Sequence, residues 1–194
     1  MSQIRNGLKK IMKTIVLDNV LSQKELHFLY SNLIGSDGWN INAISSLKNE
    51  NNRFEFNSGP VLQVKDNNET IKNNVFFMWG QTLVHRIHAL LEEKNIGIPT
   101  SVFRMWFNTT YNGKKTQHWL HRDDNENTGT KSILLFMTPI WQPDWRGSFY
   151  VDGEKFEFKP GSAIIFDSNE FHKGESPLSE TYNWQRVTCN ILIK

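Results

Sequence analysis

Three residues of the sequence have the side-chain types and the spacing of a metal site: His121, Asp123 and His172. Two imidazoles and one carboxylate on one side of an ion leave positions open on the other side, which is the ligand set of non-haem Fe(II) oxygen chemistry. His121 and Asp123 are two residues apart, so on a β-strand their side chains would leave the same face. The pattern is weak by itself, because a histidine is more often a surface or core residue than a ligand.

Arg186 adds a candidate anion-binding site, because it lies in the strand-like segment RVTCNILI, residues 186–193. Alternation along this segment produces one wholly apolar face and one polar face that carries Arg186, Thr188 and Asn190. An arginine that faces a protein interior needs an anionic partner, and its guanidinium can bind a carboxylate through two hydrogen bonds. The alternative is a sheet edge that leaves Arg186 in water.

The elements that would position these residues change in character near residue 100. Two helices are expected before it. The first begins at a capping box of Ser22 and Glu25 and ends at Gly35. The second spans about residues 69–94, where apolar residues recur at helical spacing, and residues 53–65 between the two helices are expected to be strand and loop.

Short strands and turns are expected from residue 102 onward. A tight hairpin is indicated at Asp152-Gly153 and a turn at Pro160-Gly161. The strand-like segments are VFRMWFNTTY, SILLFMT, GSFYV, KFEF, SAIIFD and RVTCNILI. The sequence therefore predicts a mainly β fold with α, a double-sheet jelly roll buttressed by N-terminal helices.

The chain as a whole fits a single domain over residues 1–194, with a support region at 1–100 and a catalytic core at 101–194. A net charge of +2 argues against wholesale nucleic-acid binding. The single cysteine, Cys189, excludes an intramolecular disulfide and a cysteine-based zinc site. No apolar run approaches the roughly 20 residues of a membrane span, and no secretory leader is recognisable. We therefore expect a cytoplasmic protein that does not bind membranes.

Residues 102–194 resemble the catalytic core of the 2-oxoglutarate/Fe(II)-dependent oxygenase superfamily, and most closely its prolyl-4-hydroxylase-like branch. The resemblance rests on Tyr111, ten residues before His121, and on the segments HRD, WRGSFYV, KPGSAIIFD, FH and RVT. Two departures stand out. Arg146 replaces the first glycine of the usual pair before Phe149, and Phe136 stands near a position where the branch often has a tyrosine.

The resemblance implies a double-stranded β-helix core of the jelly-roll, cupin-like type. It implies Fe(II), 2-oxoglutarate and O₂ as cofactors, with ascorbate as a further candidate. In this assignment iron is bound by His121, Asp123 and His172, and Arg186 binds the distal carboxylate of 2-oxoglutarate and completes the catalytic set. Thr188 and Tyr111 would be further cosubstrate contacts; these six residues are the predicted site.

The reaction that the resemblance implies is hydroxylation of a C–H bond with release of succinate and CO₂. A peptidyl residue such as proline is the first choice of substrate, by analogy alone. A nucleic-acid or small-molecule oxygenase of the same superfamily is the alternative. Leu192 counts against the alkylated-base demethylases, which carry a second arginine at that position. A non-catalytic cupin-like binding protein remains a third interpretation, against which the intact set of site residues argues.

Overall fold

The computed structural model describes residues 14–35, 40–42, 55–65, 68–71, 74–110, 120–124, 128–178 and 185–194. For residues 40–42, 55–65, 68–71, 74 and 110 it describes the backbone alone. The helices and strands are β1 (Ile15–Leu17), α1 (Gln23–Ile34), β2 (Asn40–Asn42), β3 (Glu55–Lys65), β4 (Asn68–Ile71), α2 (Asn74–Glu92), β5 (Val102–Thr110), β6 (Lys131–Phe136), the 3₁₀ turn η1 (Pro143–Trp145), β7 (Phe149–Val151), β8 (Glu154–Phe156), β9 (Ala163–Asp167), β10 (His172–Gly174) and β11 (Arg186–Ile193).

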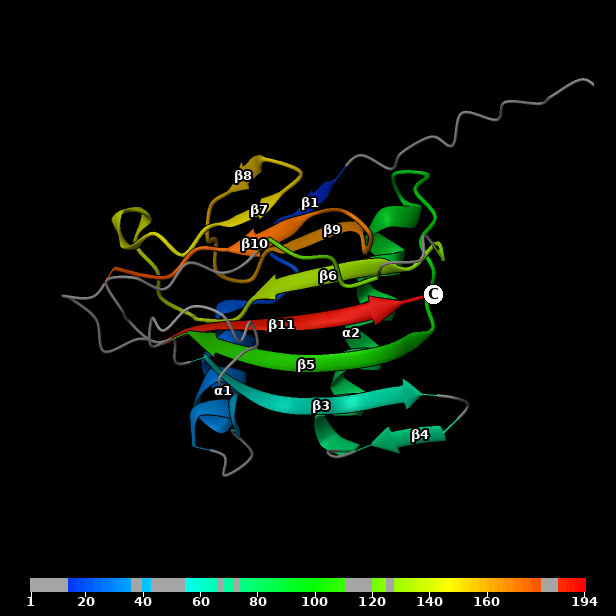
Figure 1. Ribbon diagram of the computed structural model, residues 1–194, viewed down its shortest axis with the longest axis horizontal. Helices are drawn as coiled ribbons and strands as arrows, with labels where there is room; N and C mark the ends of the chain where they lie inside the picture. Colours follow the sequence, from blue (N-terminus) through cyan, green and yellow to red (C-terminus); the bar gives the residue numbers. More distant parts are fainter. Residues whose placement is uncertain are drawn as a thin grey trace, which may run out of the picture.

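The strands form two antiparallel sheets, so the fold is mainly β with α, as the sequence predicts. The main sheet has eight strands in the order β1-β9-β6-β11-β5-β3-β2, and β4 pairs with β3. The small sheet has three strands in the order β10-β7-β8. Both helices lie behind the main sheet in Figure 1, and the small sheet lies on its other side, over β9 and β6. We call the face of the main sheet that points to the small sheet the inner face.

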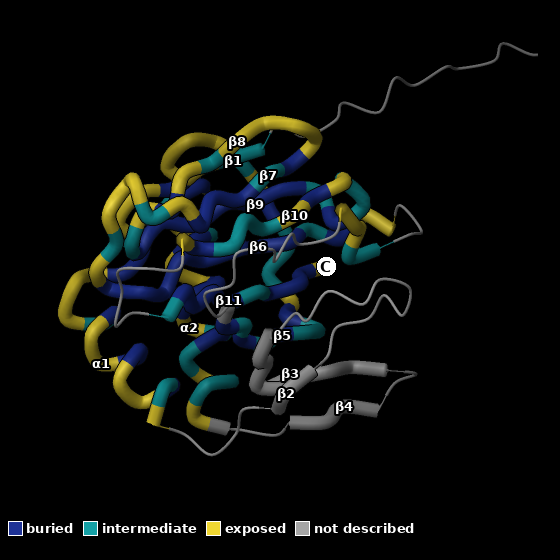
Figure 2. Tube along the Cα trace, turned by 60° about the vertical axis from the view of Figure 1, so that its left-hand side comes forward, coloured by how far each residue is buried: buried dark blue, intermediate teal, exposed yellow. Residues whose placement is uncertain are grey.

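Two hydrophobic cores fill the spaces between these layers. The larger core lies between the helices and the main sheet, and Val187, Cys189 and Ile191 of β11 contribute to it. The smaller core lies between the two sheets and includes Leu134 and Phe136 of β6. Buried residues accordingly follow the central strands, whereas the helices expose their outer sides (Figure 2). Alternation on β11 therefore turns its polar residues to the inner face.

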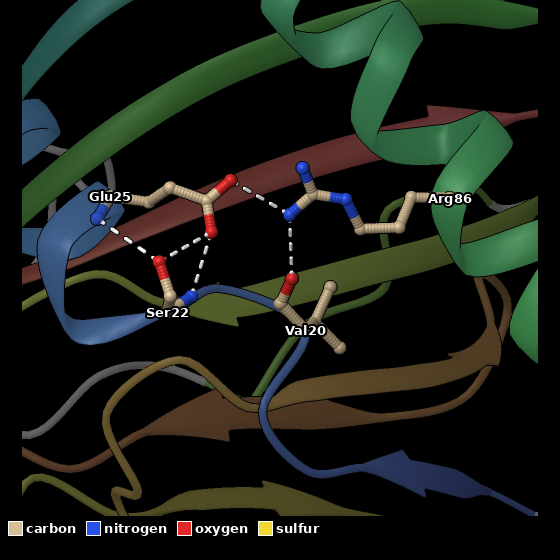
Figure 3. A network of polar contacts seen from close by, with 4 residues as sticks. All are labelled: Val20, Ser22, Glu25 and Arg86. Carbon is tan, nitrogen blue, oxygen red and sulfur yellow. Dashed lines mark hydrogen bonds and ion pairs between the residues drawn. The ribbon is translucent and has the colours of Figure 1, made fainter.

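Helix α1 begins and ends where the sequence predicts. The side chain of Ser22 accepts a hydrogen bond from the Glu25 amide, and Glu25 accepts from the Ser22 amide at 2.8 Å, which completes the capping box. Arg86 of α2 donates to the Val20 carbonyl at 3.0 Å and pairs with Glu25 at 2.9 Å (Figure 3). The hydrogen bond from the Ser22 amide is the main cause of the lowered pKa of Glu25. The network joins the start of α1 to the middle of α2.

Helix α2 begins later than the sequence predicts. The expectation of a helix from residue 69 is wrong, because residues 68–71 form β4 and pair with β3. The helix starts at Asn74, just before the apolar repeat begins. Its fully buried side chains include Leu83, Ile87 and Leu91. Pairing with a long neighbouring strand has overridden the helical preference of residues 69–71.

The N-terminal region and the C-terminal half build one sheet together. Strand β1 pairs with β9, and β3 pairs with β5. The hairpin between β7 and β8 turns at Asp152 and Gly153, both with positive φ, as the sequence predicts. Gly161 also has a positive φ, and a Cβ there would lie 2.5 Å from the carbonyl oxygen of Leu21. Among the described residues, no helix is long and apolar enough to cross a bilayer.

Candidate metal centre and anion site

The structure brings His121, Asp123 and His172 together at the β10 edge of the small sheet. One donor atom from each residue lies within 4.8 Å of the other two. Asp123 Oδ1 is 3.6 Å from His172 Nε2 and 4.0 Å from His121 Nε2. Two metal–ligand bonds of about 2.1 Å span at most about 4.2 Å, so both separations fit ligands of a single divalent ion. The donor types and the two separations from Asp123 thus fit the ion that the sequence predicts.

His121 and His172 meet through an antiparallel bridge between their backbones, with hydrogen bonds of 3.0 and 2.9 Å. The two rings lie with their centroids 4.3 Å apart. His172 is 3% exposed and packs against Phe149 and Phe166. The side chain of His121 is 54% exposed. The centre therefore has one buried imidazole and one that faces solvent.

The tautomer of His172 follows from its backbone contact. Nδ1 of His172 lies 3.0 Å from the carbonyl oxygen of Glu170. A carbonyl oxygen only accepts hydrogen bonds, so Nδ1 carries a proton, and Nε2 is the ring nitrogen that would bind a metal. Nε2 is the atom that points to Asp123. The imidazole is thus held in the orientation in which Nε2 can bind a metal.

The backbone that positions Asp123 differs from the predicted strand. His121 and Asp123 do not share a strand, because His121 forms only an isolated bridge and Asp123 lies in a bend. The Asp123 amide donates to the Ser168 carbonyl at 2.9 Å, which holds the bend against the end of β9. Ser132 Oγ donates to Asp123 Oδ2 at 2.7 Å. Oδ1 is left to face the two imidazoles.

Two buried serines hold this carboxylate in place. Ser132 Oγ and Ser168 Oγ are 2.9 Å apart. The single hydroxyl proton of Ser132 goes to Asp123, so Ser168 must donate to Ser132. Burial raises the pKa of Asp123, but hydrogen bonds and charge from His172, together with Ser132 and His121, hold it below the ordinary value. The carboxylate is therefore ionised at neutral pH.

We expect Ser132→Ala to weaken metal binding about tenfold or more while the fold survives. Loss of the hydroxyl frees Asp123 Oδ2 to rotate, and groups that orient metal ligands typically contribute 10–100-fold to affinity. Titration with Mn(II) measures the effect. Ser162→Ala is the matched control, because the buried hydroxyl of Ser162 donates to the Lys159 carbonyl instead. Equal metal affinity in the two variants would contradict the role of Ser132.

The predicted anion site lies further along the inner face. Arg186 is 3% exposed and begins β11, so the alternative of a solvated sheet edge is wrong. Its Nε donates to the Gly147 carbonyl at 2.8 Å. Its guanidinium carbon lies 5.6 Å from the centre of the Phe158 ring. Thr188, two residues on, is also buried and lies opposite Phe136 on the neighbouring strand.

Gly147 is needed for this close approach. A Cβ at Gly147 would lie 2.7 Å from Trp141 Cζ2 and 3.2 Å from Arg186 Cδ. The preceding Arg146, where the resemblance leads us to expect a glycine, also has a positive φ of 59°, with ψ at −140°. This conformation is close to one that is essentially restricted to glycine. Arg146 therefore has a backbone conformation that favours glycine.

We expect Arg146→Gly to raise the free energy of unfolding by about 1 kcal/mol, because it relieves this strain. The side chain of Arg146 is exposed, and its carbonyl still accepts from Trp141. Denaturant unfolding gives the value. Asp152→Gly is the control, because aspartate tolerates its left-handed φ of 46° and should gain less. An Arg146→Gly protein less stable than wild type would contradict the argument.

The structure assembles most of the predicted site and adds to it. Tyr111 lies outside the described residues. Phe136 is fully buried against Phe158, with ring centroids 4.4 Å apart, and offers no hydroxyl. Sequence reasoning missed Ser132 and Ser168. The only signal was that Ser132 is the polar first residue of the segment SILLFMT.

Neither a protein-family model nor a curated protein matches the sequence. Solved structures do match. An oxidoreductase of the 2OG-Fe(II) oxygenase family from Burkholderia pseudomallei aligns over 92% of this chain and 84% of its own, with a TM-score of 0.67 and 12% identity. A Pseudomonas putida prolyl-4-hydroxylase aligns over 93% and 92%, with a TM-score of 0.63 and 15% identity.

A third match is a Trichoplax adhaerens prolyl hydroxylase in complex with a peptide fragment of hypoxia-inducible factor. It aligns over 93% of this chain and 83% of its own, with a TM-score of 0.59 and 14% identity. At such low identity the likeness concerns the fold. The chain has the fold of the 2-oxoglutarate/Fe(II) oxygenases, among them prolyl hydroxylases.

Proposed function

We propose that the chain is an Fe(II)- and 2-oxoglutarate-dependent dioxygenase, with the three-ligand cluster as its iron site. The observation that carries the proposal is the convergence of one carboxylate and two imidazoles within 4.8 Å on a fold of that kind. When bound, Fe(II) and 2-oxoglutarate supply the oxidising chemistry, in which O₂ converts 2-oxoglutarate to succinate and CO₂ and hydroxylates a C–H bond. The two sheets then correspond to a double-stranded β-helix, and residues 1–194 to one catalytic domain.

The metal and 2-oxoglutarate bind to different residues along the inner face. His121, Asp123 and His172 hold the metal at one end. Arg186 and Thr188 bind the distal carboxylate of 2-oxoglutarate at the other. Leu134 of β6 and Asn190 of β11, which are paired across the strands, lie between the two ends. Phe136, Phe158 and Trp141 surround the anion end with aromatic rings that exclude water and strengthen the pairing with Arg186.

The substrate that we propose is a peptidyl residue such as proline. Its support is the fold shared with prolyl hydroxylases, one of which is in complex with a peptide. Fold alone does not carry a substrate, so the proposal needs a direct assay. A nucleic-acid or small-molecule substrate is an outcome of the same assay.

Anaerobic titration with Fe(II) and 2-oxoglutarate tests the cofactors, because chelation produces a visible absorption band. Succinate formation in air, with peptides, free amino acids and oligonucleotides in parallel, then tests turnover and substrate class. His172→Ala is the control that removes the buried ligand. Binding without succinate formation under any condition would instead identify a non-catalytic binding protein.

A further inference from the structure

A second arginine on the inner face is not used by the metal centre or the proposed cosubstrate site. Arg104 lies on β5, opposite Leu192 of β11, which in turn lies opposite Ser132 of β6. Residues paired across strands point to the same face, so Arg104 shares the inner face with Ser132. Two strand spacings separate their Cα atoms, about 10 Å. Arg104 therefore lies at the same position along the strands as Ser132, whose hydroxyl binds Asp123 of the metal centre.

The guanidinium of Arg104 is positioned by an aromatic partner. Its Cζ lies 4.5 Å from the centre of the Trp106 ring. With the Asn108 amide oxygen turned toward them, that oxygen accepts from Trp106 Nε1 at 3.2 Å and from Asn190 Nδ2 at 3.0 Å. The indole is thus fixed by a network that reaches β11. Stacking on a fixed ring holds a guanidinium while leaving its edge available for hydrogen bonds.

Among the residues that the structure describes, Arg104 lacks the acceptor that such an arrangement needs. Its Nε is buried and makes no hydrogen bond. None of the described acidic side chains forms an ion pair with it. A buried donor without an acceptor is costly, and a carboxylate is the natural ligand for a guanidinium edge. Figure 1 shows β5 beside the small sheet rather than beneath it, so no described strand covers this part of the inner face.

We propose that Arg104, stacked on Trp106, binds a carboxylate of the substrate beside the metal centre. The inference rests on the proposed function and names the substrate class as an acidic peptide, with Asp or Glu near the target residue. A nucleic-acid backbone fits less well. On the inner face of β5 and β11 the only other described cation is Arg186, whereas nucleic acid binds to a basic stripe.

Capped peptides with one central proline provide the probe. Glu or Gln is placed at each of the four nearest flanking positions, and binding to the Mn(II)- and 2-oxoglutarate-loaded protein is measured. At one or more positions we expect Glu to bind at least about tenfold more tightly than Gln. Arg104→Gln should remove that preference, Arg104→Lys should keep part of it, and Arg104→Glu should favour a Lys peptide. Free amino acids and an oligonucleotide of equal charge are run alongside.

Lys194→Gln is the matched control. It removes an exposed cation just beyond the end of β11, whose ammonium lies 5.3 Å from the Phe103 ring rather than on Trp106. This variant should keep the wild-type preference for Glu. Wild type that treats Glu and Gln alike, or that binds only the oligonucleotide, overturns the inference. So does loss of Mn(II) or 2-oxoglutarate binding in Arg104→Gln, because Arg104 would then serve the cofactors. Failure of wild type to bind Mn(II) and 2-oxoglutarate at all counts against the proposed function.

Discussion

Asp123→Ala is expected to abolish succinate formation and to weaken metal binding by more than a hundredfold, while the circular dichroism spectrum stays that of wild type. Asp123 supplies the one carboxylate of the cluster, and its Oδ1 faces both imidazoles. Groups that merely orient ligands contribute 10–100-fold, so loss of a ligand itself should cost more. The fold should survive, because the Asp123 amide still donates to the Ser168 carbonyl.

The neighbouring Asp124 provides the control for this experiment. Its carboxylate accepts from Thr128 rather than facing the histidines. Asp124→Ala therefore removes the same charge one residue away without touching the cluster. Mn(II) titration and succinate release are measured for both variants. Turnover near the wild-type level in Asp123→Ala would remove Asp123 from the site, whereas equal losses in both variants would point to a general effect of charge.

The parts of the fold that the sequence predicts well are those that depend on local chemistry. The capping box of α1 needs only Ser22 and Glu25, and the hairpin after β7 needs only Asp152 and Gly153. Long alternating segments such as β11 are also visible, because one face is continuously apolar. Among the three-residue strands, β7 and β8 lie in predicted segments, whereas β1 and β10 do not. β1 and β10 have too few residues for a period, and they exist because β9 and β7 offer them partners.

In the candidate site, too, some features follow from the local sequence and others from tertiary contacts. The identities of the three metal ligands follow from residue type and spacing, and their role as ligands stays a prediction. The contacts that bring the three side chains together could not be predicted from the sequence. Asp123 is aimed by Ser132 and anchored by Ser168, residues 9 and 45 positions away in the chain. Contacts of this kind arise from packing of the bend onto β6 and β9, which no local pattern encodes.

Arg186→Ala is expected to weaken 2-oxoglutarate binding by roughly a hundredfold or more. Arg186 is buried on the inner face, and removing one partner of a buried, hydrogen-bonded charge pair costs about 3–5 kcal/mol. Arg186→Lys keeps the charge but loses the planar fork, so it should retain only part of the affinity. The dissociation constant of 2-oxoglutarate is measured with Fe(II) under anaerobic conditions. Arg146→Ala, which removes an exposed cation next to Gly147, should bind as wild type does.

Because Phe136 has no hydroxyl, 2-oxoglutarate binding should depend more strongly on Arg186. Phe136 lies opposite Thr188 and packs on Phe158, whose ring is also close to the Arg186 guanidinium. Phe136→Tyr should add a hydroxyl donor near the same carboxylate and tighten binding by about tenfold or more, the effect of one hydrogen bond to a charged group. In the Arg186→Ala background, the tyrosine should recover part of the lost affinity. If Arg186→Ala binds 2-oxoglutarate as tightly as wild type, the anchor is misassigned, whatever the tyrosine does. If only the tyrosine has no effect, Arg186 remains the anchor and the aromatic cluster leaves no room for the added oxygen.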